Sequence, residues 1–280
     1  MAAITIIIIT NITIRKTHTG TTRPPLRKAA NKLRVIDLHC HILPGIDDGP
    51  KTLGQSLAMA RHAVSHGIRL SIATPHIHLG CYDNDCDNIR DAQQKFQQAL
   101  AEEGIALQLG MAAEVRVDAH LPGLVEAGKL PFIGSWEGLN ALLIEFPDNH
   151  LPAGSEALVR WLIGRGILPV IAHPERNRTF VYHPDKLMPF VELGCLMQIT
   201  AASLTGLFGP DVRQFAVSLA RQGLVTFMAS DAHNLEKRIP NMLPALDRLY
   251  ALIGRGKADD LVNGNPQKLL GQIQGFILTN

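Results

Sequence analysis

Seven short apolar runs, separated by longer segments with helical periodicity, follow one another along the chain. They occupy residues 34–38, 70–74, 107–115, 141–146, 168–172, 196–200 and 225–229. Their hydrophobicity is continuous rather than alternating, as is typical of strands that are buried on both faces in a parallel sheet wrapped by helices. Seven such strand–helix units predict an α/β fold, a seven-stranded (β/α) barrel.

The segments between the runs have the period of amphipathic helices. The predicted helices span residues 53–66, 84–103, 155–165, 184–193 and 211–222. Each is followed by a glycine at a position that favours a left-handed residue. These glycines are Gly67, Gly104, Gly166, Gly194 and Gly223. Asn265 and Pro266 predict the N-cap and first turn of a last helix near residues 267–272.

The composition is that of a globular protein with ample apolar material for a core. Of the 280 residues, 46% are hydrophobic and 19% are charged, and barrels of this size routinely form one domain. Residues 1–34 hold seven Lys or Arg and no Asp or Glu, so the other 246 residues, with 20 basic and 25 acidic side chains, carry a net charge of −5. This acidic body argues against nucleic acid as a partner, because phosphate-backbone binding needs clustered Lys and Arg.

The two ends differ in composition from the rest of the chain. The apolar run at residues 2–14 is too short to span a bilayer of about 30 Å as a helix, and its flanking charges follow it, unlike those of a signal peptide. Residues 17–34 are rich in Thr, Pro and basic residues. We expect residues 1–34 to be a flexible extension outside the fold, arising from a start codon placed too far upstream, followed by one domain at 35–272 and a tail at 273–280.

The four cysteines are too few for a disulfide framework in a chain of this length. They are Cys40, Cys81, Cys86 and Cys195. Their sparse use indicates free thiols, a reducing compartment and hence a cytoplasmic location. Cys81 and Cys86 have the spacing of half a zinc knuckle, but no second Cys or His pair follows at the required distance. We interpret them as two loop thiols.

Ionisable residues recur where the predicted strands end. They are His39 and His41 after the first run, His76 after the second, Glu114 at the end of the third, Glu145 at the end of the fourth, His173 after the fifth, and Asp231 and His233 after the seventh. The carboxyl ends of parallel barrel strands meet at one mouth. The pattern therefore predicts that these eight residues lie together, while the sixth run ends in Thr200 and offers no ligand.

The chemistry of the predicted mouth favours metal ions. His39 and His41 are two residues apart, so both imidazoles point to the same side of an extended strand end. The mouth also gathers four carboxylates, those of Asp48, Glu114, Glu145 and Asp231. These carboxylates would repel one another unless cations neutralised them. A mixed nitrogen and oxygen ligand set suits Mn, Fe or Zn and argues against Ca.

Two arginines follow predicted ligands, Arg176 three residues after His173 and Arg238 seven residues after Asp231. Beside a metal mouth, two guanidiniums indicate a bidentate phosphate clamp. No Cys has an Arg six positions later, as cysteine phosphatases need, and the chain has neither a Gly-rich phosphate loop nor a G-x-S-x-G elbow. The residues thus favour metal-assisted hydrolysis of a phosphate ester.

Seven motifs stand in order along residues 35–270. They are Asp37-Leu38-His39-Cys40-His41, Asp47-Asp48-Gly49-Pro50, Thr74-Pro75-His76, Ala113-Glu114, Ile144-Glu145-Phe146, Ala172-His173-Pro174-Glu175-Arg176 and Ala229-Ser230-Asp231-Ala232-His233-Asn234. This series resembles the polymerase-and-histidinol-phosphatase (PHP) superfamily. More narrowly, it is similar to the manganese-dependent protein-tyrosine phosphatases of capsule and exopolysaccharide loci, the CpsB/YwqE type.

The resemblance implies a distorted, TIM-like seven-stranded barrel that holds three metal ions, Mn²⁺ in the first place, with Fe or Zn as alternatives. It assigns one ion to His39, His41, Glu114 and Asp231, a second to Glu114, Glu145 and His173, and a third to Asp48, His76 and His233. Arg176 and Arg238 would grip the phosphate. His233 or a metal-bound water would donate a proton to the leaving phenol. The implied partner is the phosphotyrosine tail of a bacterial tyrosine kinase that controls polysaccharide assembly.

Other residues receive supporting or no roles. Asp37 and Asn234 are expected to orient the ligands. Five further histidines are expected away from the mouth, namely His62, His66, His120, His150 and His183.

Three alternatives remain open from the sequence. The first is another PHP phosphoesterase, acting on histidinol phosphate or a nucleotide end. The second is an amidohydrolase, which shares the H-x-H pair on its first strand, although Asp48 and the two arginines argue against it. The third is a metal-bound scaffold that sequesters the kinase tail without turnover. The sequence also leaves open the metal, the oligomeric state and the identity of the kinase.

Overall fold

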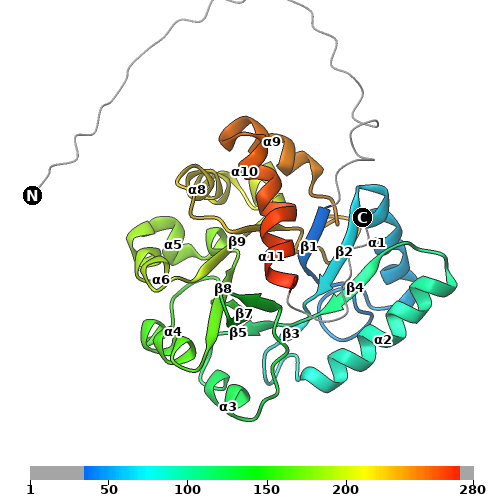
Figure 1. Cartoon of the computed structure of the whole chain (residues 1–280), viewed down its shortest axis with the longest axis horizontal. Helices are drawn as coiled ribbons and strands as arrows, with labels where there is room; N and C mark the ends of the chain where they lie inside the picture. The colour runs from blue at the N-terminus through cyan, green and yellow to red at the C-terminus, as the bar shows by residue number, and fades with distance from the viewer. Residues whose placement is uncertain (1–34, 272–280) are drawn as a thin grey trace, which may run out of the picture.

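Strands and helices alternate along the computed structural model, which describes residues 35–271 (Figure 1). The predicted extension at 1–34 and tail at 273–280 lie outside the described residues. The strands are β1 (Val35–Cys40), β2 (Ile68–Ala73), β3 (His76–Ile77), β4 (Gln108–Met111), β5 (Glu114–Arg116), β6 (Gly134–Trp136), β7 (Leu139–Glu145), β8 (Ile167–Ala172), β9 (Leu196–Thr200) and β10 (Phe227–Ala229).

The helices lie outside the strands, as Figure 1 shows for α1, α2, α4 and α8. The α-helices are α1 (Leu53–Ser65), α2 (Cys86–Glu102), α3 (Leu121–Glu126), α4 (Ser155–Ile163), α5 (Arg178–Tyr182), α6 (Met188–Glu192), α7 (Ala201–Thr205), α8 (Pro210–Arg221), α9 (Leu243–Ile253), α10 (Arg255–Asp259) and α11 (Asn265–Leu270). Two 3₁₀ turns, η2 (Pro174–Arg176) and η3 (Pro184–Leu187), and one π-helix, η4 (Asp260–Gly264), complete the described elements.

The strands form two parallel sheets that join into a distorted barrel. One sheet has the order β1-β2-β4 and the other β10-β9-β8-β7-β5-β3. At one seam, His41 N donates to Ala232 O and Asp231 N donates to His39 O, both at 2.8 Å. At the other side, β2 and β4 of the first sheet continue into β3 and β5 of the second, and Ala112 N donates to Ala73 O at 2.8 Å between the two strand pairs. Every predicted run contributes a strand, so the predicted α/β barrel is confirmed.

Several strand boundaries differ from the prediction. The run at 107–115 forms two strands, β4 and β5, in different sheets, and Glu114 therefore begins a strand rather than ending one. Strands β2 and β3 are separated at Pro75, which has no N–H for the ladder and restricts the residue before it. Strand β6, which was not predicted, pairs antiparallel with β7. Glu137 and Gly138 connect the two, with φ of 51° and 85°, as a tight hairpin turn requires.

Four of the predicted helices match α1, α2, α4 and α8 within a few residues. The helix predicted at 184–193 is instead η3 followed by α6, because Pro189 at the start of α6 has no N–H to continue the hydrogen bonding. All five predicted capping glycines have positive φ, between 62° and 87°. The prediction of Asn265 as an N-cap is wrong. The π-helix η4 runs directly into α11, and the Asn265 amide donates to Thr226 O at 2.9 Å.

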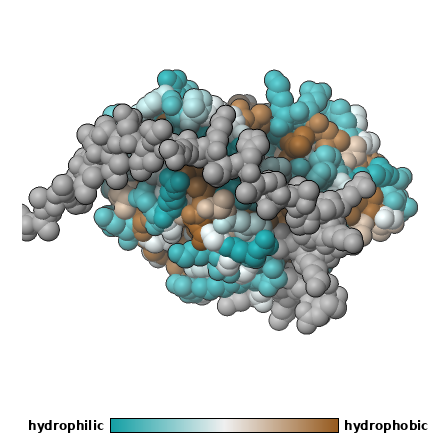
Figure 2. All heavy atoms as spheres, turned by 90° about the horizontal axis from the view of Figure 1, so that it is seen from above, coloured by the Kyte–Doolittle hydropathy of each residue, from teal (hydrophilic) through white to brown (hydrophobic). Residues whose placement is uncertain are grey.

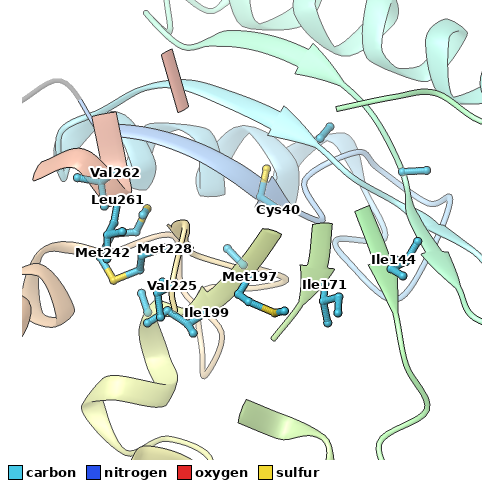
Figure 3. Packing of buried hydrophobic residues seen from close by; sticks show 14 of the residues in the cluster. Cys40, Ile144, Ile171, Met197, Ile199, Val225, Met228, Met242, Leu261 and Val262 are labelled. Carbon is cyan, nitrogen blue, oxygen red and sulfur yellow. The ribbon is translucent and has the colours of Figure 1, made fainter. Parts of the chain in front are cut away.

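Two layers of apolar side chains hold the barrel together. Along β7, Ala141 and Leu143 belong to an inner cluster, and Leu142 and Ile144 belong to an outer one that packs against the helices. Figure 3 shows part of the outer cluster: Leu261 and Val262 of η4 lie beside Met242 and Met228, and Met197, Ile171 and Ile144 of β9, β8 and β7 follow across the view. Residues two apart on a strand share a face. The face of Ala141 and Leu143 therefore carries Glu145 at the end of β7, where the apolar interior gives way to the mouth.

Helix α11 packs against β6 at a position where only glycine fits. A Cβ on Gly134 would lie 2.5 Å from the backbone O of Leu269 and 2.8 Å from its Cγ. We expect Gly134→Ala to lower the free energy of unfolding by about 1–3 kcal/mol, because the helix must shift. Urea unfolding measures this. The control is Gly54→Ala in exposed α1, where no atom lies within 4 Å of the added Cβ. It should leave stability unchanged or raise it, and equal losses in both variants would contradict the prediction.

The visible surface has no separate hydrophobic face. In the space-filling view, the brown hydrophobic residues lie among teal hydrophilic ones (Figure 2). Within residues 35–271, no helix combines the length and the apolar character that crossing a membrane requires.

Candidate active site

One mouth of the barrel brings together every residue that the sequence predicted as a metal ligand. These are His39 in β1, His41 and Asp48 in the loop after it, His76 in β3, Glu114 in β5, Glu145 in β7, His173 after β8, and Asp231 and His233 after β10. Their donor atoms form four overlapping groups, each within 4.8 Å. All are buried except His76, whose side chain is 15% exposed, and Asp48, which is 41% exposed. Asp48 thus marks the open side of the mouth.

The first group surrounds His39 and His41. Their Nε2 atoms lie 3.1 Å apart, and Glu114 Oε2 is 3.3 and 3.2 Å from them. Asp231 Oδ1 is 3.4 and 3.6 Å from the same two nitrogens. Ligand atoms bound at about 2.0–2.2 Å to one ion lie about 3–3.5 Å from each other. The spacing of the four atoms therefore fits a shared cation.

The histidine rings are turned by hydrogen bonds on their other nitrogens. His41 Nδ1 donates to Asp47 Oδ2 at 2.6 Å, and His233 Nδ1 donates to the backbone O of Asp231 at 3.0 Å. His39 Nδ1 lies 2.6 Å from Gln198 Oε1. A proton on Nδ1 leaves the Nε2 lone pair facing the mouth, as metal-binding histidines require. Asp231 Oδ1 and His233 Nε2 are buried there without a hydrogen-bond partner, so the residues fit a bound metal.

Asp47 tests whether this orientation matters. We expect Asp47→Ala to lower metal affinity by about 10- to 100-fold, because His41 loses the acceptor that fixes its ring. Titration of the metal-free protein with Mn²⁺ measures the affinity. Asp47→Asn is the matched control, since it keeps an oxygen that can accept from Nδ1, and it should lose less. The expectation would be wrong if Asp47→Ala bound Mn²⁺ as tightly as the wild type.

The second group is centred on Glu114 in β5. Its Oε1 lies 2.7 Å from His173 Nε2, which is 3.7 Å from Glu145 Oε1. Burial, together with the charge of Glu114, raises the pKa of Glu145 to about 8, although Arg116 donates to it at 2.8 Å. Two buried carboxylates that interact in this way need more positive charge than Arg116 supplies. Burial lowers the pKa of His173 to about 4, which keeps it in the neutral form that binds metals.

The third group stands at the open side of the mouth. Asp48 Oδ1 lies 3.2 Å from His233 Nε2 and 3.5 Å from His76 Nε2. The other nitrogen of His76 is 3.2 Å from Glu114 Oε2, so His76 links this group to the other two. Burial lowers the pKa of His233 to about 4. The three predicted sets are thus contiguous, and His41 joins the third.

Both predicted arginines reach the mouth. Arg176 Nη1 and Arg238 Nη2 each lie 2.5 Å from Asp231 Oδ2. The Arg176 guanidinium also packs over the ring of Phe208, 4.8 Å from its centroid. His173 and Asp231 have positive φ, 31° and 52°. Such backbone is costly for residues other than glycine and clusters at functional sites.

Several residues around the site were missed by the sequence reading. Asp47 lies next to the predicted ligand Asp48 in the same motif, and this position could have indicated its role. Gln198 lies two residues before Thr200 on the sixth run, for which no ligand was predicted. Glu175 accepts from Thr200 N at 2.8 Å and from Ser203 Oγ at 2.7 Å. It thereby ties the turn that carries Arg176 to β9.

The residues predicted to orient ligands act through the backbone. Asp37 accepts hydrogen bonds from Ser230 N at 2.8 Å and from Ser230 Oγ at 2.5 Å, just before Asp231. Asn234 Oδ1 accepts from the amides of Glu236, Lys237 and Arg238. His78 and the five histidines expected away from the mouth belong to none of the four donor groups, and all four cysteines are free thiols.

The family follows from a comparison of the chain with known proteins. Residues 35–271 match the model of the family described as capsular polysaccharide synthesis, CpsB/CapC. The chain belongs to the CpsB/CapC family. The match covers the whole described barrel with its mouth residues, and the resemblance seen in the motifs is confirmed.

Relatives of this CpsB/CapC-family chain include phosphatases. It is 41% identical to the tyrosine-protein phosphatase YwqE of Bacillus subtilis over 73% of this chain and 79% of the relative. It is 35% identical to CapC of Staphylococcus aureus, over 76% and 82%. A crystal structure from work on YwqE and CpsB of Streptococcus pneumoniae, described as metal-dependent tyrosine phosphatases, matches with a TM-score of 0.78 and 38% identity. That match covers 84% of this chain and 94% of the other.

Proposed function

We propose that this protein is a metal-dependent protein tyrosine phosphatase that acts with three divalent ions, with Mn²⁺ as the preferred metal. The observation that carries the proposal is the convergence of four overlapping donor groups and two arginines at one barrel mouth. Relatives named as tyrosine phosphatases, covered over most of their length, support it. We further propose that residues 35–272 form the single catalytic domain.

The donor groups suggest which residues hold the ions. We assign His39, His41, Glu114 and Asp231 to the first ion. We assign Glu114, Glu145 and His173 to the second, and Asp48, His76 and His233 to the third. When bound, such ions supply an activated water and neutralise charge on the phosphoryl oxygens.

The arginines bind the phosphate in this proposal. A guanidinium carries five N–H donors in a planar fork, so a contact with Asp231 leaves others for phosphoryl oxygens. Arg238 Nε is buried without a hydrogen-bond partner, which an anion at the mouth would supply. The packing of Arg176 on Phe208 fixes the plane of its fork. Both charges then stabilise the phosphate as negative charge develops on it.

His233 serves better as a ligand than as the proton donor. Its Nδ1 proton is held by the backbone O of Asp231, and burial keeps the ring neutral. The Nε2 atom therefore presents a lone pair rather than a proton. The tyrosyl leaving group has a pKa of about 10 and needs little help from an acid.

The proposed physiological substrate is the phosphotyrosine tail of a bacterial tyrosine kinase that regulates capsule or exopolysaccharide synthesis. The family description, capsular polysaccharide synthesis, supports this context.

Hydrolysis of a phosphotyrosyl peptide tests the proposal. We expect activity with Mn²⁺, its loss after chelation, and its return when Mn²⁺ is restored. Phosphotyrosyl peptide should be cleaved faster than histidinol phosphate. Activity that survives chelation would refute the metal mechanism, and faster cleavage of histidinol phosphate would point to another phosphoesterase. Binding of the peptide without turnover would point to a scaffold.

A further inference from the structure

A groove leads from the open side of the mouth toward α1. Its volume is about 420 Å³. It is lined by Asp48 and His233 of the mouth, by residues of α1 and the loop before it (Gly49, Pro50, Lys51, Gln55, Ala58 and Met59), and by Asn234, Leu235 and Glu236 after β10. We call this the α1 groove. Asp48 and His233 also belong to the proposed third metal group, so a substrate held by the metals and arginines has direct access to the groove.

Beyond Asp48 and His233, the residues of the α1 groove belong to neither the donor groups nor the arginine clamp. Besides the charged Lys51 and Glu236, they include the apolar Pro50, Ala58 and Leu235. The groove has the size of pockets that enclose drug-sized ligands, roughly 300–1,000 Å³. It therefore has room for part of a substrate beyond the phosphorylated ring, which a small phosphate ester would leave empty.

Leu235, an apolar lining residue of the groove, belongs to the loop that carries Arg238. Leu235 is 42% exposed although it is a large apolar side chain. Asn234 Oδ1 accepts from the amides of Glu236, Lys237 and Arg238 at 3.1, 2.9 and 3.2 Å. These bonds fix Leu235 relative to Arg238. Because Leu235 is already held in place, it can contact a substrate side chain next to the phosphate without the entropic cost of ordering the loop.

We propose that the α1 groove binds the polypeptide immediately flanking the phosphotyrosine, with an apolar side chain of the substrate packed against Leu235 and Ala58. This inference rests on the proposed phosphatase function and deepens it. The groove then selects among phosphoproteins, and it distinguishes a phosphotyrosyl protein from a small phosphate ester.

The test compares two substrates in one variant. Leu235→Asp should lower kcat/KM about tenfold for a phosphotyrosyl peptide with leucines on both sides of the phosphotyrosine, through KM. Hydrolysis of p-nitrophenyl phosphate should change less than twofold. Ala58→Asp, at the α1 side of the groove, should give the same selective loss. Met188→Asp is the matched control, because Met188 is 39% exposed and lies outside the groove.

The outcomes separate the groove from the proposed function. Equal losses on both substrates, or no loss on either, would overturn the α1 groove as a peptide site. In the wild type, replacing the flanking leucines by aspartates should also raise KM, and an unchanged KM would overturn it as well. A wild type that cleaves p-nitrophenyl phosphate but no phosphotyrosyl peptide would instead overturn the proposed protein substrate.

Discussion

Glu114→Gln is expected to lower kcat/KM for a phosphotyrosyl peptide with Mn²⁺ by about 1,000-fold. Glu114 Oε2 lies 3.2–3.3 Å from nitrogens of His39, His41 and His76. Its Oε1 is 2.7 Å from His173 Nε2. Glutamine has the same shape but no charge, so the change removes the shared anionic ligand without opening a cavity.

Metal content separates this effect from unfolding. Glu114→Gln should bind fewer Mn²⁺ ions per chain than the wild type, measured by atomic absorption after dialysis, while its circular dichroism stays unchanged. Glu126→Gln is the control, because Glu126 is exposed and lies in α3, away from the donor groups. A Glu114→Gln protein with full metal content and normal activity would exclude Glu114 as a ligand.

Arg176→Ala and Arg238→Ala are each expected to lower kcat/KM by about 100- to 1,000-fold, because each removes a fixed donor from the developing phosphate charge. The lysine variants should recover little, since an ammonium cannot form the planar fork that binds two phosphoryl oxygens. Steady-state kinetics with phosphotyrosyl peptide measure both effects.

The neighbouring cations serve as matched controls for the arginine variants. Arg178 and Lys237 are exposed and lie two residues and one residue from the clamp. Arg178→Ala and Lys237→Ala should keep normal kinetics. The Mn²⁺ content of the clamp variants should stay near that of the wild type. If metal content falls in proportion to activity, the arginines hold Asp231 as a ligand and do not bind the phosphate.

The gathering of the mouth residues could be predicted because strand–helix units repeat along the chain. Once each apolar run is a parallel strand, the residue at its carboxyl end has one location available, the barrel mouth. His39, His173 and Asp231 are far apart in sequence, yet the periodic pattern alone brings them together. The positive φ of the glycines after α1 and α8 could also be predicted from neighbouring residues, because it depends on how the helix ends within one turn.

The ends of helices and strands were harder to predict from the sequence. The predicted helix at 184–193 is interrupted at Pro189, although its apolar period continues through the interruption. Asn265 has the chemistry of an N-cap, but its amide is used by Thr226 of another element. Pro189 was visible in the sequence, but the apolar period outweighed it in the prediction. For Asn265, a local preference was overridden by bonding that a window of sequence does not contain.

The sequence by itself determined the barrel, the identities of the proposed metal ligands and the presence of two arginines near them. Only the tertiary structure decided which groups hold those side chains in place. Gln198 meets His39 across 159 positions, and Ser230 meets Asp37 across 193. The α1 groove likewise needs α1 and the loop after β10 to lie side by side. Strand periodicity is a short-range property that the chain carries locally, whereas a hydrogen-bond partner or a groove wall is fixed by how distant segments pack.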